Sequence, residues 1–233
     1  MFKNYLFRCH SIGKLMTEPK LKADKEAGNL SETTKTFLME VFIQEKFNRK
    51  KDISNKYIEK GLLVEDEAIK LYSRIKLEDY VKNDNRFKND YLIGTPDIIS
   101  DSVIDIKSSW DIFTFFATMN KDVDSAYYWQ LQAYLALTGA SVAKLAYCLV
   151  NTPETLINDE KRKLMYKMNV ATDENPEYLK ACEELEHSMT FDDIPLTTRL
   201  IEFEIKRNDE DILKMYTKID KARVYLNELN EKI

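Results

Sequence analysis

Between residues 91 and 150 the chain alternates between two hydrophobic periodicities, and this alternation limits the possible folds more than any other feature. Short β-branched runs, YLIG, DIIS and SVIDIK, are separated by the turn formers Ser100, Asp101 and Ser102 and predict a β-hairpin. The run SAYYWQLQAYLALTGA predicts a helix of about four turns that ends at Gly139, and VAKLAYCLVN predicts a buried strand. This order of strands and helix predicts a mixed α/β core.

Amphipathic segments outside this region supply helices to cover the core. SETTKTFLMEVFIQEKFN begins at the N-cap Ser31 and predicts a helix, and SNKYIEKGLLVEDEAIKLYSRI predicts a second helix that Ser54 caps and that contains Glu65. Near the end of the chain, RLIEFEIK alternates as a strand and Asn208 caps a long helix. We therefore predict an α/β fold with a central mixed β-sheet flanked by helices.

The length of the chain predicts a single domain over residues 1–233. Residues 152–198 are rich in charge and lack a clean period, so a helical insertion is possible there. No apolar run approaches the roughly 20 residues of a membrane helix, and charged residues interrupt the first sixteen residues, where a signal peptide would be apolar. We expect a cytoplasmic protein without a membrane partner.

Residue counts exclude several kinds of site. Three cysteines cannot form a four-cysteine cluster, two histidines cannot form a multi-histidine metal site, and no glycine-rich phosphate loop is present. Any metal is therefore expected to bind oxygen ligands. The net charge of −5 argues against a protein that coats nucleic acid, but it permits an enzyme with a local basic groove.

The predicted hairpin carries the residues best suited to chemistry. Asp105 and Lys107 are two residues apart, so their side chains share one face of a strand, and the paired strand can bring Asp97 beside them. Asp97, Asp105 and the backbone oxygen of Ile106 form a plausible partial shell for Mg²⁺, with Mn²⁺ able to substitute. Lys107 could stabilise the extra negative charge of phosphodiester hydrolysis. The alternative is an ordinary solvated hairpin with an Asp–Lys pair.

Five blocks in order resemble the lambda-exonuclease-like (YqaJ-type) alkaline exonucleases of phages, within the PD-(D/E)XK nuclease superfamily. They are RCHSIGKLMT near the start, GLLVEDEA at 61–68, TPD at 95–97, DIK at 105–107 and QLQAY at 130–134. The resemblance implies a restriction-endonuclease-like core. It also implies metal ligation by Asp97 and Asp105, assistance from the helical acid Glu65, and a catalytic role for Lys107.

The same resemblance implies DNA contacts and partners. Gln130 and Tyr134 would support the active site and touch the DNA backbone, while Thr95, Arg8 and Ser11 would bind a 5′ phosphate. Core packing for Tyr134, and a helix cap or surface charge for Arg8 and Ser11, stay open as alternatives. The family pattern further implies a ring trimer that threads duplex DNA and a single-strand annealing partner.

The leading hypothesis is thus a metal-dependent 5′→3′ exonuclease acting on linear double-stranded DNA in phage-type recombination or repair. Two rivals lie in the same superfamily, an endonuclease and a RecB-like repair nuclease. A noncatalytic DNA-end-binding module is the rival from another class. Retention of Glu65, Asp97, Asp105 and Lys107 argues against that module, because a cluster of carboxylates is repulsive without a catalytic use.

Overall fold

The computed structural model describes residues 1–51 and 55–233, and the strands of this part form two mixed sheets. The smaller sheet has the order β1–β3–β2 and the larger has the order β4–β5–β6–β7. In the larger sheet β5 and β6 run parallel, while β4 and β7 pair antiparallel at its edges. The strands are β1 (Phe7–Arg8), β2 (Phe87–Lys88), β3 (Leu92–Gly94), β4 (Ile98–Ile99), β5 (Val103–Ser108), β6 (Val142–Cys148) and β7 (Leu200–Lys206).

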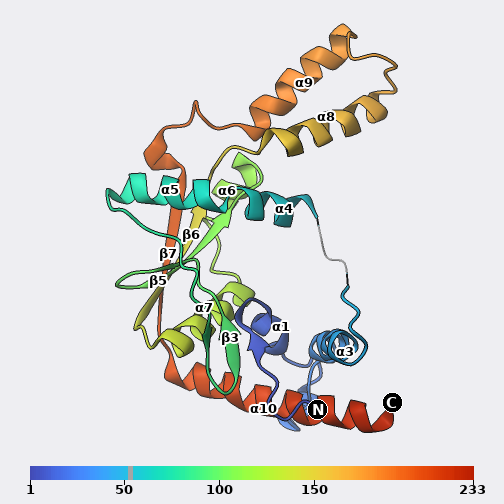
Figure 1. Cartoon of the computed structure of the whole chain (residues 1–233), viewed down its shortest axis with the longest axis vertical. Coiled ribbons are helices and arrows are strands. Elements are labelled where there is room, and N and C mark those ends of the chain that lie inside the picture. The colour runs from blue at the N-terminus through green and yellow to red at the C-terminus, as the bar shows by residue number, and fades with distance from the viewer. Residues whose placement is uncertain (52–54) are drawn as a thin grey trace.

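Helices flank these sheets, as Figure 1 shows, so the predicted α/β class is confirmed. No helix in the described ranges is both long enough and apolar enough to cross a bilayer. The α-helices are α1 (Ile12–Leu15), α2 (Lys22–Glu26), α3 (Glu32–Phe47), α4 (Lys56–Leu63), α5 (Glu65–Lys76), α6 (Ile112–Ala117), α7 (Ser125–Thr138), α8 (Glu154–Met168), α9 (Pro176–Met189) and α10 (Asp209–Lys232). Short 3₁₀ turns η1 (Cys9–Ser11) and η2 (Leu196–Thr198) complete the set.

Side-chain caps fix several helix ends where the sequence predicts them. The Ser31 hydroxyl accepts a hydrogen bond from the Thr34 amide at 3.0 Å, and the Asn208 side chain caps α10. Gly139 ends α7 in the left-handed conformation, with φ at 76°. These ends confirm the predicted helices over residues 31–48, 125–139 and 209–232.

Alternation along β5 divides its side chains between two apolar clusters, one on each face of the sheet. Ile104 and Ile106 pack in one apolar cluster with Ala68 and Tyr72 of α5. Val103, on the opposite face of β5, belongs to a second cluster that includes Leu131 of α7 together with residues of α1, α3 and α10. Because strand side chains alternate, Asp105 and Lys107 must project on the α7 side of the sheet.

Three local details differ from expectation. The predicted hairpin is confirmed for β4 and β5, but YLIG contributes β3 to the smaller sheet instead. The single helix predicted from Ser54 is instead two helices. Helix α4 ends before Val64, and α5 begins at Glu65. Asn55 caps α4, whereas Ser54 lies outside the described residues.

Residues 152–198 include the two helices α8 and α9, which pack against each other and project from one end of the molecule (Figure 1). The Asn175 side chain caps α9, and the Tyr178 hydroxyl donates to the Lys161 carbonyl of α8 at 3.1 Å. The N-terminus lies at the opposite end, beside α10, where the Phe2 amide donates to Asn227. The segment predicted as a possible helical insertion is therefore a two-helix arm.

Close packing between α1 and α7 requires a glycine. A Cβ at Gly13 would lie 2.6 Å from the Ala126 Cα, so we expect Gly13→Ala to lower the free energy of unfolding by about 1–3 kcal/mol. Gly61, inside α4, is the matched control, because a Cβ there would meet nothing within 4 Å. Gly61→Ala should raise the stability by about 0.5–1 kcal/mol. Urea unfolding compares them, and equal stabilities would contradict this packing.

Candidate active site

The buried Asp105 and the half-buried Lys107 form an ion pair at the centre of the larger sheet. Asp105 is only 1% exposed, and Lys107 Nζ lies 2.5 Å from Asp105 Oδ2. The other side of Lys107 faces the Tyr127 ring of α7, 5.2 Å from Nζ to the ring centre. An ordinary solvated hairpin would leave this pair in water, so the burial of Asp105 argues against that alternative.

Asp97 joins this pair at the open edge of β5. The two strands of the hairpin pair only at Ile98↔Ile104 and Ile99↔Val103, so β4 does not cover the edge of β5 at Ile106. Asp97 Oδ2 occupies this edge and accepts a hydrogen bond from the Ile106 amide at 2.7 Å. The carbonyl of a strand residue points to the same side as its amide, which places the Ile106 oxygen on the Asp97 side. Asp97, Ile106 and Asp105 are therefore brought together as predicted.

The electrostatics reflect two carboxylates that share one cation. Burial, and then the nearby Asp105 carboxylate, raise the pKa of Asp97. Burial alone would lower the pKa of Lys107, but the charges of Asp105 and Asp97 outweigh it and raise that pKa. The cluster has one negative charge in excess, which suits the binding of a further cation.

Helix α7 supports the cluster through the predicted Gln130–Tyr134 pair. Gln130 Nε2 donates to Asp105 Oδ1 at 2.9 Å and lies 3.3 Å from the Tyr134 hydroxyl. That hydroxyl in turn donates to the Thr95 carbonyl at 3.3 Å. Both side chains are about 5% exposed. Gln130 thus orients a candidate ligand, and Tyr134 links α7 to the loop before Asp97.

Glu65 forms an ion pair with Lys82, a lysine that no sequence motif contains. Lys82 Nζ lies 3.1 Å from Glu65 Oε1 and 3.5 Å from Asp66 Oδ1. Glu65 is close enough to help raise the pKa of Asp97, as a smaller cause than burial and Asp105, while Lys107 and the Ile106 amide act to lower that pKa. The structure therefore places Glu65 beside the site while its carboxylate pairs with Lys82.

The donor set fits a hard cation through two carboxylates. No three acidic, histidine or cysteine side chains in the described residues lie close enough together to form a metal cage. Asp105 Oδ2 is buried and, within that same part of the chain, makes only the ion pair to Lys107 and no hydrogen bond. Mg²⁺ commonly binds one or two carboxylates and completes its shell with water and phosphate. Asp97, Asp105 and the Ile106 carbonyl match that requirement.

A hollow of about 350 Å³ lies beside these residues and contains three of the predicted DNA contacts. Its lining includes Arg8, Thr95 and Tyr134, and it adds His10 and Arg86. Ser11 does not line it; the Ser11 hydroxyl donates to the Arg8 carbonyl at 3.0 Å. Arg86 precedes β2 within NDNRFKND, which carries no recognisable motif, so only the fold brings it to this place.

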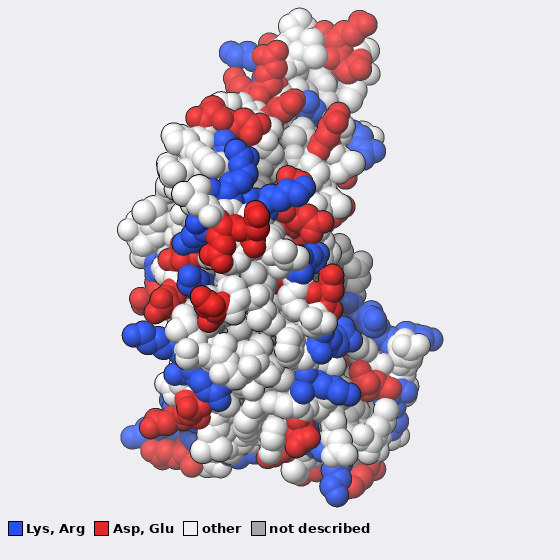
Figure 2. Space-filling view, turned by 60° about the vertical axis from the view of Figure 1, so that its left-hand side comes forward, with Lys and Arg blue, Asp and Glu red and all other residues white. Residues whose placement is uncertain are grey.

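The hollow has a local excess of positive charge, because its lining holds Arg8 and Arg86 against a single acidic residue, Glu45. Burial, and then Arg8, Lys107 and Lys14, lower the pKa of His10, so several cations act at one point. Figure 2 shows one face of the molecule, over which Lys and Arg are interspersed with Asp and Glu. The net negative charge is therefore compatible with a small basic site.

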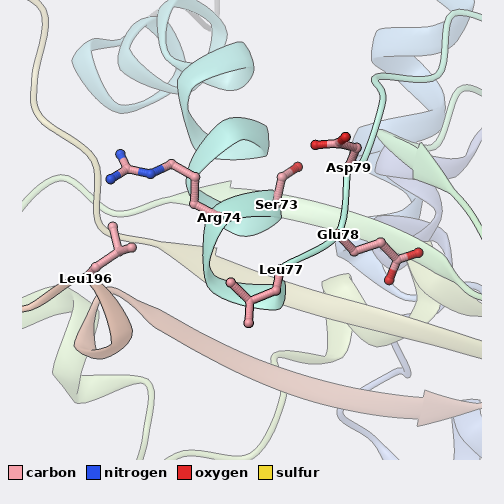
Figure 3. A pocket seen from close by; sticks show the side chains of 6 residues that line it. All are labelled: Ser73, Arg74, Leu77, Glu78, Asp79 and Leu196. Carbon is pink, nitrogen blue, oxygen red and sulfur yellow. The ribbon is translucent and has the colours of Figure 1, made fainter.

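A second hollow lies at the far end of α5 (Figure 3). It has a volume of about 400 Å³ and is lined by Ser73, Arg74, Leu77, Glu78, Asp79 and Leu196. Glu65 begins the same helix, about 12 Å of helix rise before Ser73. The two hollows share no lining residue, and we assign no role to this second one.

Comparison with solved structures decides the fold family. A phage-related exonuclease from Haemophilus somnus 129PT superposes with a TM-score of 0.78 at 28% identity, covering 98% of this chain and 96% of that one. This chain has the fold of the phage exonucleases. The alkaline exonuclease from Laribacter hongkongensis has the same fold, with a TM-score of 0.63 at 14% identity over 99% of this chain and 94% of its own.

The exonuclease fold thus extends over nearly the whole chain, including the arm that the sequence motifs do not cover. No protein-family model matches the sequence, and no curated protein matches it. The resemblance to lambda-exonuclease-like alkaline exonucleases is confirmed by these neighbours. Membership of the PD-(D/E)XK superfamily, like the roles of the individual residues, stays a prediction.

Proposed function

We propose that this chain is a Mg²⁺-dependent exonuclease that degrades one strand of linear double-stranded DNA from its 5′ end, with Mn²⁺ able to substitute. The observation that supports this most is the cluster of the buried Asp105 with the half-buried Asp97 and Lys107, beside a hollow lined by Arg8, Arg86 and Thr95. The likeness to exonucleases of known structure supports the reaction class. We place the protein in phage-type recombination or repair on the family pattern alone.

Each residue has a defined task in this proposal. Asp97, Asp105 and the Ile106 carbonyl would hold Mg²⁺, with Glu65 assisting, and the ion would activate water and neutralise phosphate charge. Lys107 stabilises the negative charge that grows on the phosphate during hydrolysis. Gln130 holds Asp105 in place through its 2.9 Å hydrogen bond. Water is limited around Asp105 by burial, which strengthens these charge interactions.

The hollow supports the part of the proposal that concerns the 5′ end of the DNA strand. Two guanidinium groups can bind a phosphate dianion, and the Thr95 hydroxyl can donate a further hydrogen bond. Tyr134 lines the hollow and also contacts Gln130, so a phosphate bound there lies within one side chain of the catalytic cluster. The Laribacter hongkongensis exonuclease has also been solved with dAMP, a nucleoside monophosphate of the kind that exonuclease cleavage releases.

Three duplex substrates test the function. One carries 5′ phosphates, one carries 5′ hydroxyls and one is a covalently closed circle, each incubated with Mg²⁺ while both strands are followed by label. We expect each strand of the linear duplexes to shorten from its 5′ end and not from its 3′ end, faster with 5′ phosphates, while the circles stay intact. Nicked circles would favour the endonuclease alternative. Absence of cleavage with Mg²⁺ and Mn²⁺ would favour the DNA-end-binding module.

Neutralising the basic hollow should remove the preference for a 5′ phosphate. We expect the double variant Arg8→Gln/Arg86→Gln to lose about a hundredfold or more in rate on 5′-phosphorylated ends, because each of the two charged hydrogen bonds contributes about 1.5–3 kcal/mol. The rate on 5′-hydroxyl ends should change by less than about threefold. Lys88→Gln is the control, since this exposed cation of β2 lies outside the hollow. Equal losses on both substrates would contradict the assignment.

Assembly and partners extend the proposal. On the family pattern we propose a ring trimer that threads duplex DNA and cooperates with a single-strand annealing protein. Native mass spectrometry at micromolar concentration should then give three copies of the chain. A monomer that digests long duplexes without dissociating would contradict the ring.

A further inference from the structure

Lys60 of α4 is a buried lysine that the proposed mechanism does not use. It is 1% exposed, and its ammonium group donates to the Ser109 carbonyl at 2.7 Å and to the Trp110 carbonyl at 3.2 Å. The aromatic rings of Phe191 and Trp110 lie 5.3 Å and 5.8 Å from Nζ. Burial lowers the pKa of this lysine to about 7, with a smaller opposing effect from Asp111. A charge placed here carries a desolvation cost.

The contacts of Lys60 lie directly after the catalytic strand. Ser109 follows Lys107 by two residues, and the Ser109 amide donates to the Cys148 carbonyl at the end of β6. Ser109 and Trp110 lie beyond the last paired residue of β5, so the sheet no longer fixes the direction of their carbonyls. The Lys60 ammonium supplies the donor that holds both.

The backbone at Lys60 also leads into the turn before Glu65. The Lys60 carbonyl accepts the Val64 amide at 3.0 Å, at the break between α4 and α5. Lys60 therefore connects the segment after Lys107 with the turn before Glu65. Gln130 does not support either of these segments, since its side-chain amide donates to Asp105 and Tyr134.

We propose that Lys60 is a positioning residue, which holds the backbone at Ser109 and Trp110 and so keeps the end of β5, which carries Lys107, in place. This inference rests on the proposed nuclease function. Because Lys60 lies outside the basic hollow and has almost no exposed surface, it acts on the rate of the chemical step and not on DNA binding.

The test compares Lys60→Met, Lys60→Arg and the matched control Lys56→Met. Methionine keeps the unbranched shape without the donors, and arginine keeps a charged donor. Lys56 belongs to the same helix and lies over the same Trp110 ring, at 4.5 Å, but it pairs with Glu160 and is one-third exposed. Steady-state kinetics on 5′-phosphorylated duplex give kcat and KM separately. Hydrogen exchange of the peptide 105–111 and the unfolding midpoint are measured on the same samples.

We expect Lys60→Met to lower kcat by at least tenfold with KM within about twofold, and to speed exchange in the peptide 105–111. Its unfolding midpoint should stay within about 4 °C. Lys60→Arg should recover part of kcat, and Lys56→Met should match the wild type. An unchanged kcat in Lys60→Met, or the same loss in Lys56→Met, would overturn the proposal. Unchanged exchange in Lys60→Met would also overturn it. If the wild type has no nuclease activity, the proposed function has failed, and hydrogen exchange still tests the role of Lys60 by itself.

Discussion

Replacing Lys107 with alanine is expected to lower the rate of DNA hydrolysis by about 10²–10³-fold, because it removes the cation that would face the reacting phosphate. Lys107 is the basic residue closest to the carboxylate pair, with Nζ 2.5 Å from Asp105 Oδ2. Its pKa is raised by the charges of Asp105 and Asp97, which outweigh the effect of burial, so it is fully charged at neutral pH. The measurement is kcat on a 5′-phosphorylated duplex in saturating Mg²⁺.

A second readout separates this role from that of a metal ligand. Lys107→Ala removes a positive charge next to Asp105, so calorimetric binding of Mn²⁺ should be as tight as in the wild type or tighter. Lys144→Ala is the control, because Lys144 lies on the neighbouring strand in register with Ile104 and contacts Glu202 on the other face of the sheet. Full nuclease activity in Lys107→Ala would contradict the mechanism. Equal loss in Lys144→Ala would indicate general damage to the sheet.

The sequence predicts those parts of the site that depend on local geometry. Asp105 and Lys107 must share one face because strand side chains alternate, and Gln130 and Tyr134 must share one face because they are four residues apart in a helix. The structure confirms both arrangements through the Lys107–Asp105 pair and the Gln130–Tyr134 contact. Neither inference requires knowledge of which elements pack together.

Contacts between distant elements could not be predicted in this way. The bond from Gln130 to Asp105 depends on how α7 crosses β5, and the approach of Arg86 to Arg8 depends on the smaller sheet, in which β1 and β2 both pair with β3. The break at Val64 also lacks a signal at the position itself, since Val64 and its two direct neighbours are neither glycine nor proline. It nevertheless decides where Glu65 lies, because Glu65 begins α5 beside Lys82.

Replacing Asp97 with asparagine is expected to abolish metal-dependent activity and to stabilise the metal-free protein. Asparagine keeps an oxygen that can accept the Ile106 amide, now at 2.7 Å from Asp97 Oδ2, so the local geometry is preserved. Charge at the cluster falls from two carboxylates and one ammonium to one of each. Burial and the Asp105 charge, which raise the pKa of Asp97, show that the ionised form of Asp97 is disfavoured here.

The expected gain in stability follows from this unfavourable ionisation of Asp97. Removing a buried like-charge contact should raise the free energy of unfolding by about 1–3 kcal/mol at pH 8, which is a midpoint increase of several degrees in a chain of this size. Activity should fall by about 10³-fold or more, and calorimetric Mn²⁺ binding should weaken strongly, since a ligand is lost. Asp101→Asn, on the exposed turn of the hairpin, is the control and should change neither. A side chain that lowers the stability of the metal-free protein and is needed only for activity has the energetics of a catalytic residue. Asp97→Asn that loses stability and keeps activity would assign the carboxylate to the hairpin turn instead.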